Sequence, residues 1–375
     1  MCKIYDHTCN FFNLFKISHL TLMSRISMEV FGEYQKEIEV MYDIIHELVH
    51  KSLEIYHSLR QEQVKIKRDG SVVSICDFAF QMLIMHHVHK FFKDDKFLGE
   101  EEFNGISDEF LQKVAELIPK DIDINVLLEE QKHTIRHITN DMNRVWVVDP
   151  IDGTAGFTTN GQYAIATALL VNRETVLSVT AWPGHNQKYT NLPFGGPAIF
   201  CCAKGRGAFA IDMEKNIYPV HLPYKDPSQI DQGFPVDPVN IDHSKIKNAL
   251  LFSDATGNMS PRYIRFMELM GIVDKIPIIS MAKAFVLATG NAVLFPKSHK
   301  GEKIFVWDVA PVELFVREAG CYVTTADGKP VRCSEFGTIE GSEIGLIFSA
   351  YDEEKHKKAC ELFINSASDT KRSNV

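Results

Sequence analysis

Two aspartates, Asp149 and Asp152, stand three residues apart, directly after an apolar run at residues 145–148 that favours a buried strand. Between and behind them, Pro150 fixes the backbone and Gly153 permits a tight turn. This spacing lets both carboxylates point into one space, where they repel each other unless a cation lies between them. Carboxylate oxygens favour Mg²⁺, Mn²⁺ or Ca²⁺ over zinc. Taken alone, the segment is equally consistent with a structural turn, because Asp-Pro and Asp-Gly are common turn formers.

Two further segments supply carboxylates next to predicted regular structure. Glu100 and Glu101 follow a short predicted strand at residues 96–99, so they lie at another strand end. Asp308 precedes the apolar run 309–319, which places it at the expected start of a helix. An aspartate there can serve as an N-cap, and the same helix end offers free N–H groups to a phosphate. The three segments together favour a cation site over an isolated turn.

Hydrophobic periodicity predicts the elements that position these residues. Apolar residues at helical spacing, such as Val40, Ile44 and Leu48, indicate a long amphipathic helix over residues 28–60. Residues 119–143 are polar and are expected to form a surface excursion. Ser107 is expected to cap a further helix. Other helices are expected at residues 77–92, 261–270, 308–319 and 353–363. Strands are expected at residues 96–99, 145–148, 163–170, 176–181, 198–201, 249–252 and 344–348.

The 375 residues suffice for two domains or for one two-lobed unit. Gly, Pro and Asn concentrate at residues 186–196, which is the best candidate for a lobe boundary. We therefore expect an α+β lobe with the metal site at 28–195 and an α/β lobe with the substrate site at 196–365. Residues 1–27 are expected to be a poorly ordered or targeting extension, and residues 366–375 a flexible tail.

Composition limits the possible partners and locations. The formal net charge of −9 argues against a general nucleic-acid binder. No apolar run approaches the roughly 18 residues that a membrane span requires. The eight cysteines form no CxxC pair, and the chain is too long to need disulfides, so a reducing cytoplasm is the simpler location. Organelle targeting is the alternative, because residues 1–27 contain one acid but lack arginine enrichment. A monomer is favoured, although the sequence does not determine the oligomeric state.

In this order, the three carboxylate segments resemble the lithium-sensitive, Mg²⁺-dependent phosphatase superfamily. It includes inositol monophosphatases, fructose bisphosphatases and 3′(2′),5′-bisphosphate nucleotidases. Its pattern is Gly-Glu-Glu, then Asp-Pro-Ile/Leu-Asp-Gly-Thr/Ser, then Trp-Asp before a helix that ends in Glu-Ala-Gly. Residues 99–101, 149–154, 307–308 and 318–320 match it. The resemblance implies a layered αβαβα sandwich, an α/β fold in which the site lies between an α+β N-terminal lobe and an α/β C-terminal lobe.

Within the superfamily, the chain is most similar to the bisphosphate nucleotidases. Residues 69–73 followed by Asp77 resemble that branch's Asp-Gly-Ser-Pro-Val…Asp segment. Residues 156–157 match its Gly-Phe, where inositol monophosphatases tend to have Asn-Phe. Ser280 and Lys283 fit its Ser-x-x-Lys element, whose lysine contacts the nucleotide.

The sequence also departs from that branch. Ala155 replaces a lysine, residues 253–260 lack the expected His-Ser element, and Lys297 stands near the position of an arginine. A lysine would lose the bidentate grip that an arginine provides on a phosphate. These departures keep an inositol phosphatase as the alternative enzyme.

The resemblance implies two or three Mg²⁺ ions per site, with Glu101 assisting at a third, weaker one. The expected ligands are Glu100, Asp149 and the Ile151 carbonyl for one ion, and Asp149, Asp152 and Asp308 for the second.

The resemblance also assigns the remaining roles. Asp77 and Thr154 would position and deprotonate the attacking water, and the N–H groups of Gly153 and Thr154 would bind the scissile phosphate. The predicted reaction releases the 3′-phosphate of adenosine 3′,5′-bisphosphate to give AMP, and the 3′-phosphorylated sulfate donor is a second candidate substrate. An inactive nucleotide-binding protein is the alternative from another class. The expected substrate contacts are Ser280, Lys283 and Lys297.

Two other patterns invite a functional interpretation. His86, His87 and His89 could suggest zinc, but no cysteine or carboxylate spacing completes such a site. Residues 204–207, Lys-Gly-Arg-Gly, look like a phosphate cradle, yet they lack the spacing of a P-loop and favour a hairpin turn.

Overall fold

A computed structural model describes residues 26–56, 64–66, 72–159, 161–226, 236, 240–253, 259–299 and 301–369. Most of the predicted N-terminal extension and residues 69–71 of the nucleotidase-like segment lie outside this part of the chain, as do residues 254–258.

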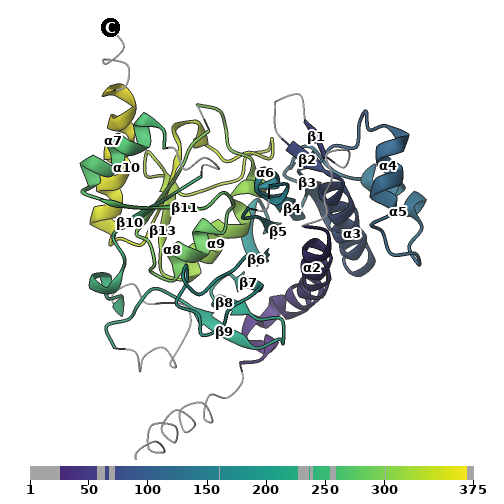
Figure 1. Cartoon of the computed structure of the whole chain (residues 1–375), viewed down its shortest axis with the longest axis horizontal. Helices are drawn as coiled ribbons and strands as arrows, with labels where there is room; N and C mark the ends of the chain where they lie inside the picture. The colour runs from purple at the N-terminus through teal and green to yellow at the C-terminus, as the bar shows by residue number, and fades with distance from the viewer. Residues whose placement is uncertain are drawn as a thin grey trace, which may run out of the picture.

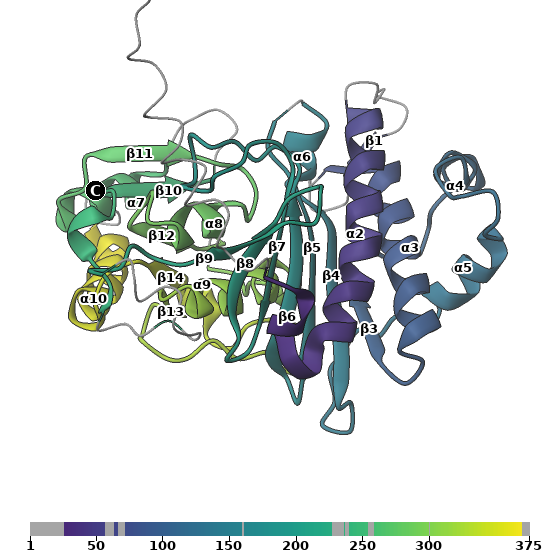
Figure 2. The same ribbon diagram turned by 90° about the horizontal axis from the view of Figure 1, so that it is seen from below.

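The elements stack in five layers, which Figures 1 and 2 show from two sides. Helices α2 (Gln35–Tyr56) and α3 (Ile75–Phe91) cover the outer face of a seven-stranded sheet. Helices α8 (Lys283–Ala288) and α9 (Ala310–Glu318) lie between that sheet and a five-stranded sheet. Helices α7 (Pro261–Met270) and α10 (Glu353–Asp369) form the far layer. The predicted αβαβα sandwich is confirmed.

The seven-stranded sheet has the order β3-β4-β5-β6-β7-β8-β9. Only the β3–β4 pair within it is parallel, and the other neighbours are antiparallel. The strands are β3 (Lys96–Gly99), β4 (Arg144–Asp152), β5 (Ala164–Val171), β6 (Glu174–Trp182), β7 (Ala198–Ala203), β8 (Gly207–Ile211) and β9 (Ile217–Val220).

This sheet continues across the boundary that composition suggested at residue 195. Strands β7, β8 and β9 extend the first sheet by antiparallel pairing. The chain passes to the five-stranded sheet only after Val220. The Gly- and Pro-rich stretch is therefore a loop within one sheet, because ladder pairing, and not the composition of a connection, determines which strands belong together.

Both faces of the central strands are buried, which explains their continuous apolar sequence. In β4, Trp146 and Val148 face the core with α2 and α3, whereas Val145 and Val147 face the core on the side of α9. Three of the four β5 residues that face the α9 side are alanines, and the fourth is Leu170, so small side chains leave room for that helix against the sheet.

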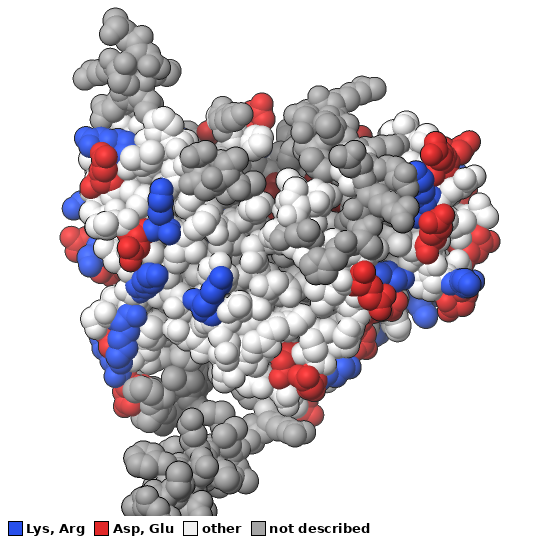
Figure 3. Space-filling view, viewed as in Figure 1, with Lys and Arg blue, Asp and Glu red and all other residues white. Residues whose placement is uncertain are grey.

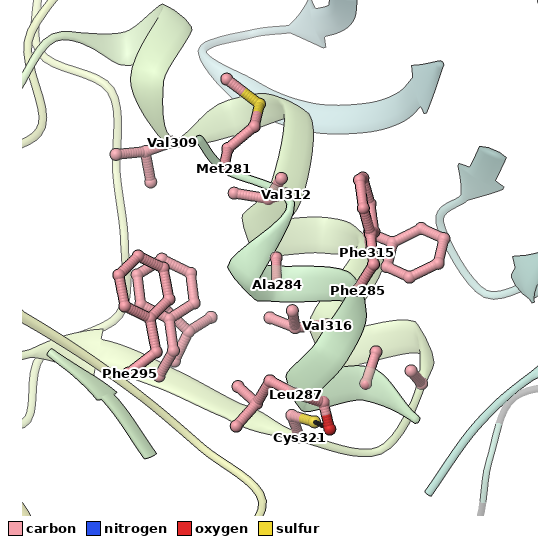
Figure 4. Close-up of a cluster of buried hydrophobic side chains, with 14 of the residues drawn as sticks. Met281, Ala284, Phe285, Leu287, Phe295, Val309, Val312, Phe315, Val316 and Cys321 are labelled. Atoms are coloured by element: carbon pink, nitrogen blue, oxygen red, sulfur yellow. Dashed lines mark hydrogen bonds between the residues drawn. The ribbon is translucent and has the colours of Figure 1, made fainter. Parts of the chain in front are cut away.

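The five-stranded sheet has the order β11-β10-β12-β14-β13. Phe285 of α8 stacks on Phe200 of β7, with ring centroids 3.8 Å apart, and Phe315 of α9 meets both rings edge-on. Figure 4 shows how the apolar side chains of α8 and α9 interlock in the middle layer. This packing joins the two sheets through one core. The strands are β10 (Ala249–Phe252), β11 (Asp274–Pro277), β12 (Leu294–Lys297), β13 (Tyr322–Thr325) and β14 (Leu346–Ser349).

The helices differ from expectation at three places. The first is split into a 3-10 segment, η1 (Met28–Tyr34), and α2, because Gly32 adopts φ 59°. The region 119–143 contains α5 (Ile124–Gln131), whose Leu127 is fully buried, so it is not only a surface excursion. Helix α10 continues to Asp369, past the expected start of a flexible tail at residue 366. The short elements are β1 (Val64–Ile66), β2 (Val72–Ser74), α4 (Asp108–Ala115), α6 (Thr154–Phe157), η5 (His243–Lys245), η6 (Val306–Asp308) and η7 (Ser342–Ile344).

Acidic and basic side chains are interspersed along the edges of the face shown in Figure 3. None of the helices in the described ranges combines the length and the apolar character that crossing a membrane requires.

Candidate metal centre

The parallel pairing of β3 with β4 brings two carboxylates together. In its register, Gly99 lies opposite Val148, so the next residues, Glu100 and Asp149, lie side by side at the point where β3 ends. The Glu100 N–H donates to the Val148 carbonyl at 3.0 Å and extends the ladder by one bond. Because parallel strands end at the same edge of a sheet, this register decides that the two side chains meet.

A bulge in β4 turns the second aspartate toward the first. Asp149 pairs with Ala166 and Asp152 with Ala164, so three steps along β4 match two along β5. Gly153 follows in the left-handed conformation at φ 88°, which only glycine adopts easily, and it begins α6.

Asp308 reaches the same place from the other half of the chain. One carboxylate oxygen each of Asp149, Asp152 and Asp308 lies within 4.8 Å of the others. Asp308 ends η6, and Val309 is the residue at the N-cap position of α9. The alternative role of Asp308 as a helix cap is therefore wrong, because α9 begins only at Ala310.

The electrostatics of this cluster fit a hard cation. Asp149 is buried, and its Oδ1 has no hydrogen-bond partner. Burial raises the pKa of Asp149 well above its ordinary value, and the charges of Glu100, Asp152 and Asp308 raise it further. Burial also raises the pKa of Asp152 to about 6, against the lowering effect of Lys297. A divalent ion among these oxygens would relieve the repulsion and satisfy the orphaned oxygen, so the residues present suit Mg²⁺.

Helices α3 and α6 together supply a carboxylate–hydroxyl pair beside the cluster, Asp77 and Thr154. The Thr154 Oγ1 atom lies 3.0 Å from Asp77 Oδ1 and 3.0 Å from the Ile151 carbonyl oxygen. One hydroxyl proton can serve only one of these acceptors at a time. Asp77 is buried, and its Oδ2 accepts from the N–H and the hydroxyl of Ser74. Burial raises the pKa of Asp77 to about 6.

The structure also identifies Gln81, which the sequence patterns did not single out. Its amide donates to the Glu101 carbonyl and accepts from the Glu101 N–H, both at 2.9 Å. A Cβ on Gly99 would lie 2.3 Å from the Gln81 Oε1 atom, so the glycine of the Gly-Glu-Glu segment makes room for this amide. The signal that could have revealed Gln81 is its position four residues after Asp77, on the same face of α3.

The two predicted substrate lysines lie on the opposite side of the cluster. The buried Lys283 ammonium donates to the Ser253 hydroxyl and to the carbonyls of Ile278 and Ser280. All three of its protons are thus donated within the protein, and burial lowers its pKa to about 7. Lys297 forms an ion pair with Asp308 at 3.0 Å.

The short connection before α8 contains Ser280 and also contacts Asp152. Ser280 is fully buried, and its hydroxyl accepts from the Ala282 N–H. The Met281 N–H donates to Asp152 Oδ2. These contacts link the predicted metal ligand Asp152 to the five-stranded half of the molecule.

The two other sequence patterns, the histidines at residues 86–89 and the segment 204–207, make contacts outside the carboxylate cluster. His86 pairs with Glu130, and within the described ranges the one group of three or more possible metal-ligating side chains is that of Asp149, Asp152 and Asp308. Residues 204–207 form the tight turn between β7 and β8, as predicted, and Glu318 of α9 accepts from the N–H groups of Gly205 and Gly207.

Comparison with known proteins is consistent with this site. The Inositol monophosphatase family matches residues 37–367. Two relatives from Arabidopsis thaliana are named "Probable 3′(2′),5′-bisphosphate nucleotidase 4" and "3′,5′-bisphosphate nucleotidase 2". They are 26% and 27% identical, each over 84% of this chain and over 91% and 92% of their own lengths, respectively.

Solved structures resemble the fold. An IMPase from Thermotoga maritima has a TM-score of 0.57 at 18% identity and covers 89% of this chain and 99% of its own. A Ca-bound IMPase family protein from Staphylococcus aureus has a TM-score of 0.56 at 16% identity and covers 88% of this chain and 95% of its own.

Replacing Gln81 tests the support of the Glu100–Glu101 loop. Gln81→Met keeps the length of the side chain but removes two backbone hydrogen bonds, each contributing about 1 kcal/mol. We expect Mg²⁺ affinity, measured by calorimetry, to fall about tenfold. The matched control Gln131→Met loses the Gln131 contacts with Gln81 and with the Met85 sulfur but leaves both Gln81–Glu101 hydrogen bonds in place, and it should change affinity less than threefold. Equal affinities in Gln81→Met and the wild type would contradict this role.

Replacing Asp149 tests the repulsion in the cluster. Because the folded-state pKa of Asp149 is raised, its contribution to stability is present at low pH and is lost as pH rises through that pKa. In EDTA at pH 7.5, Asp149→Asn should therefore unfold at a Tm about 1–2 °C higher than the wild type, which corresponds to roughly 1 kcal/mol for a chain of 375 residues. The difference should shrink at pH 5, and Mg²⁺ should stabilise only the wild type. A lower Tm for Asp149→Asn in EDTA would contradict a cluster strained by repulsion.

Proposed function

The chain belongs to the inositol monophosphatase family, and from this premise we propose that it is a Mg²⁺-dependent phosphomonoesterase that hydrolyses adenosine 3′,5′-bisphosphate to AMP and phosphate. The observation that carries the proposal is the cluster of Asp149, Asp152 and Asp308 in a chain whose relatives are named bisphosphate nucleotidases. The 3′-phosphorylated sulfate donor, which carries the same 3′-phosphate, is a second proposed substrate.

We propose that two Mg²⁺ ions bind at the cluster, with a third, weaker one near Glu101. The orphaned Oδ1 of Asp149 supports its role as a shared ligand. When bound, the ions would supply charge for the transferring phosphoryl group and lower the pKa of the attacking water. One ion would be held by Glu100, Asp149 and the Ile151 carbonyl, and the other by Asp149, Asp152 and Asp308.

Thr154 and Asp77 are the groups proposed to handle the proton of the attacking water. If a cation occupied the Ile151 carbonyl, the Thr154 hydroxyl would donate to Asp77 and keep a lone pair for the water's proton. Asp77, with a pKa of about 6, is suited to accept a proton near neutral pH. Backbone N–H groups of Gly153 and Thr154 are proposed to bind the scissile phosphate.

Ser280, Lys283 and Lys297 are proposed to face the remaining phosphate and ribose of the substrate. To bind the substrate, the Lys283 ammonium must give up one of its three hydrogen-bond acceptors. The Ser253 hydroxyl is the suitable one because Ser253 is exposed. Lys297 is partly exposed at 24% and could leave Asp308 when a cation replaces it there.

An inositol phosphatase is the second candidate. The absence of a His-Ser element at residues 253–260 favours it, and the solved structures of similar fold are described as IMPases. An inactive nucleotide-binding protein is disfavoured because all the expected carboxylates and Thr154 are present.

Phosphate release with Mg²⁺ discriminates these candidates. At matched concentrations, we expect strong preference for adenosine 3′,5′-bisphosphate over inositol 1-phosphate and no release by Asp149→Asn. Preference for inositol 1-phosphate would identify the inositol ester as the substrate and would leave the metal-site proposal unchanged. Nucleotide binding without Mg²⁺-dependent release would favour the inactive binding protein.

Replacing Thr154 tests the proton path. Thr154→Val keeps the shape of the side chain but removes the hydroxyl, so kcat should fall about 100-fold with little change in KM. Thr154→Ser retains the hydroxyl and should stay within about fivefold of the wild type. Equal losses in both variants would indicate that Thr154 acts through packing and not through its hydroxyl.

A further inference from the structure

A cavity that none of the carboxylates of the proposed metal centre lines has four cationic side chains in its wall. It has a volume of about 170 Å³, which is below the roughly 300–1,000 Å³ of sites for drug-sized ligands. None of its lining residues is among the metal ligands or substrate contacts proposed above. The cationic residues are Arg173, Lys204, Arg317 and Arg332.

Two of the four cations are already paired. Lys204 forms an ion pair with Glu174 at 2.9 Å, and Arg317 forms one with the buried Glu313 at 2.8 Å. Both acids belong to the lining of the cavity, so each removes one positive charge from it.

The guanidinium groups of the other two cations, Arg173 and Arg332, form no hydrogen bond or ion pair with another residue in the described ranges, and the Arg332 backbone carbonyl accepts from the Glu340 N–H. Arg173 is the second residue of the tight β5–β6 turn, with φ 66°, and this turn lies at the end of β5 remote from Asp152. Arg332 is exposed on the loop after β13. With the two pairs neutral, the lining keeps a charge of +2 in a chain whose net charge is −9.

The inner wall of the cavity is apolar. Val306, Ala310, Val323 and Ile339 are all buried there. A free inorganic ion would leave this wall unused, whereas a small organic anion would cover it. A guanidinium matches a phosphate through two parallel hydrogen bonds, so a pair of unpaired arginines suits a group with several anionic oxygens.

We propose that this cavity binds a small phosphate monoester whose phosphate lies between Arg173 and Arg332 and whose apolar body rests on the wall near Val306 and Ala310. The ligand is smaller than the nucleotide proposed as substrate, and its binding requires no metal ion. The site is thus distinct from the metal centre, although Val306 and Ala310 flank the segment that carries Asp308.

Phenyl phosphate and inorganic phosphate, titrated calorimetrically into the full chain in EDTA, test the site. Without a divalent ion, the carboxylates of the metal centre repel phosphates, so binding under these conditions reports the cavity. We expect phenyl phosphate to bind at least threefold more tightly than inorganic phosphate. Arg173→Ala/Arg332→Ala should weaken its binding at least tenfold.

The matched control is Arg265→Ala/Lys357→Ala. It removes the same charge from exposed positions on α7 and α10, which do not line the cavity. It should bind phenyl phosphate within twofold of the wild type. The single variant Arg332→Glu, on an exposed loop, serves if the double variant does not fold. Lack of binding to the wild type, or equal losses in the arginine variants and the control, would overturn the proposal. Tighter binding of inorganic phosphate than of phenyl phosphate would overturn the part assigned to the apolar wall.

Discussion

The mutual repulsion of carboxylates held at one place is the constraint on which the rest of this structure depends. Asp149 is buried with an unsatisfied oxygen, and Asp152 and Asp308 lie within 4.8 Å of it. Left to itself, such a group would separate or take up protons. The fold prevents separation by three rigid devices: the parallel register of β3 and β4, the bulge in β4, and the placement of η6 against the sheet. The remaining relief is proton uptake, which the raised pKa values of Asp149 and Asp152 reflect, or a bound cation.

Holding η6 in place requires the two halves of the chain to form one body. Phe200 of the first sheet stacks on Phe285 of the middle layer, and Phe315 packs against both. Helix α9, which follows Asp308, contacts strands β5 to β8 as well as β13. The carboxylate cluster, which is assembled from both halves, therefore depends on the same apolar core that joins the two sheets.

The groups around the cluster differ in charge from one side to the other. Helix α3 contributes neutral or acidic side chains, Asp77 and Gln81, which orient Thr154 and the Glu100–Glu101 loop. The five-stranded half contributes Lys283 and Lys297, whose positive charges lower the pKa of Asp152 against the effect of its burial. This asymmetry leaves one side suited to cations and water and the other to a substrate's anionic groups.

Sequence alone determined the features that depend on neighbouring residues. The Ser107 cap, the 204–207 turn and the order of the carboxylate segments are local patterns, and the layered fold followed from their resemblance to a family. The predicted end of the strand at residue 148 was wrong, because β4 continues through its bulge to Asp152. Only the tertiary structure decided contacts between distant residues. Gln81 meets Glu101 because α3 lies beside β3, and Lys297 pairs with Asp308 because β12 ends beside η6. Likewise, β7–β9 belong to the first sheet because strand pairing is selected by the whole ladder, which a change in loop composition at residues 186–196 cannot reveal.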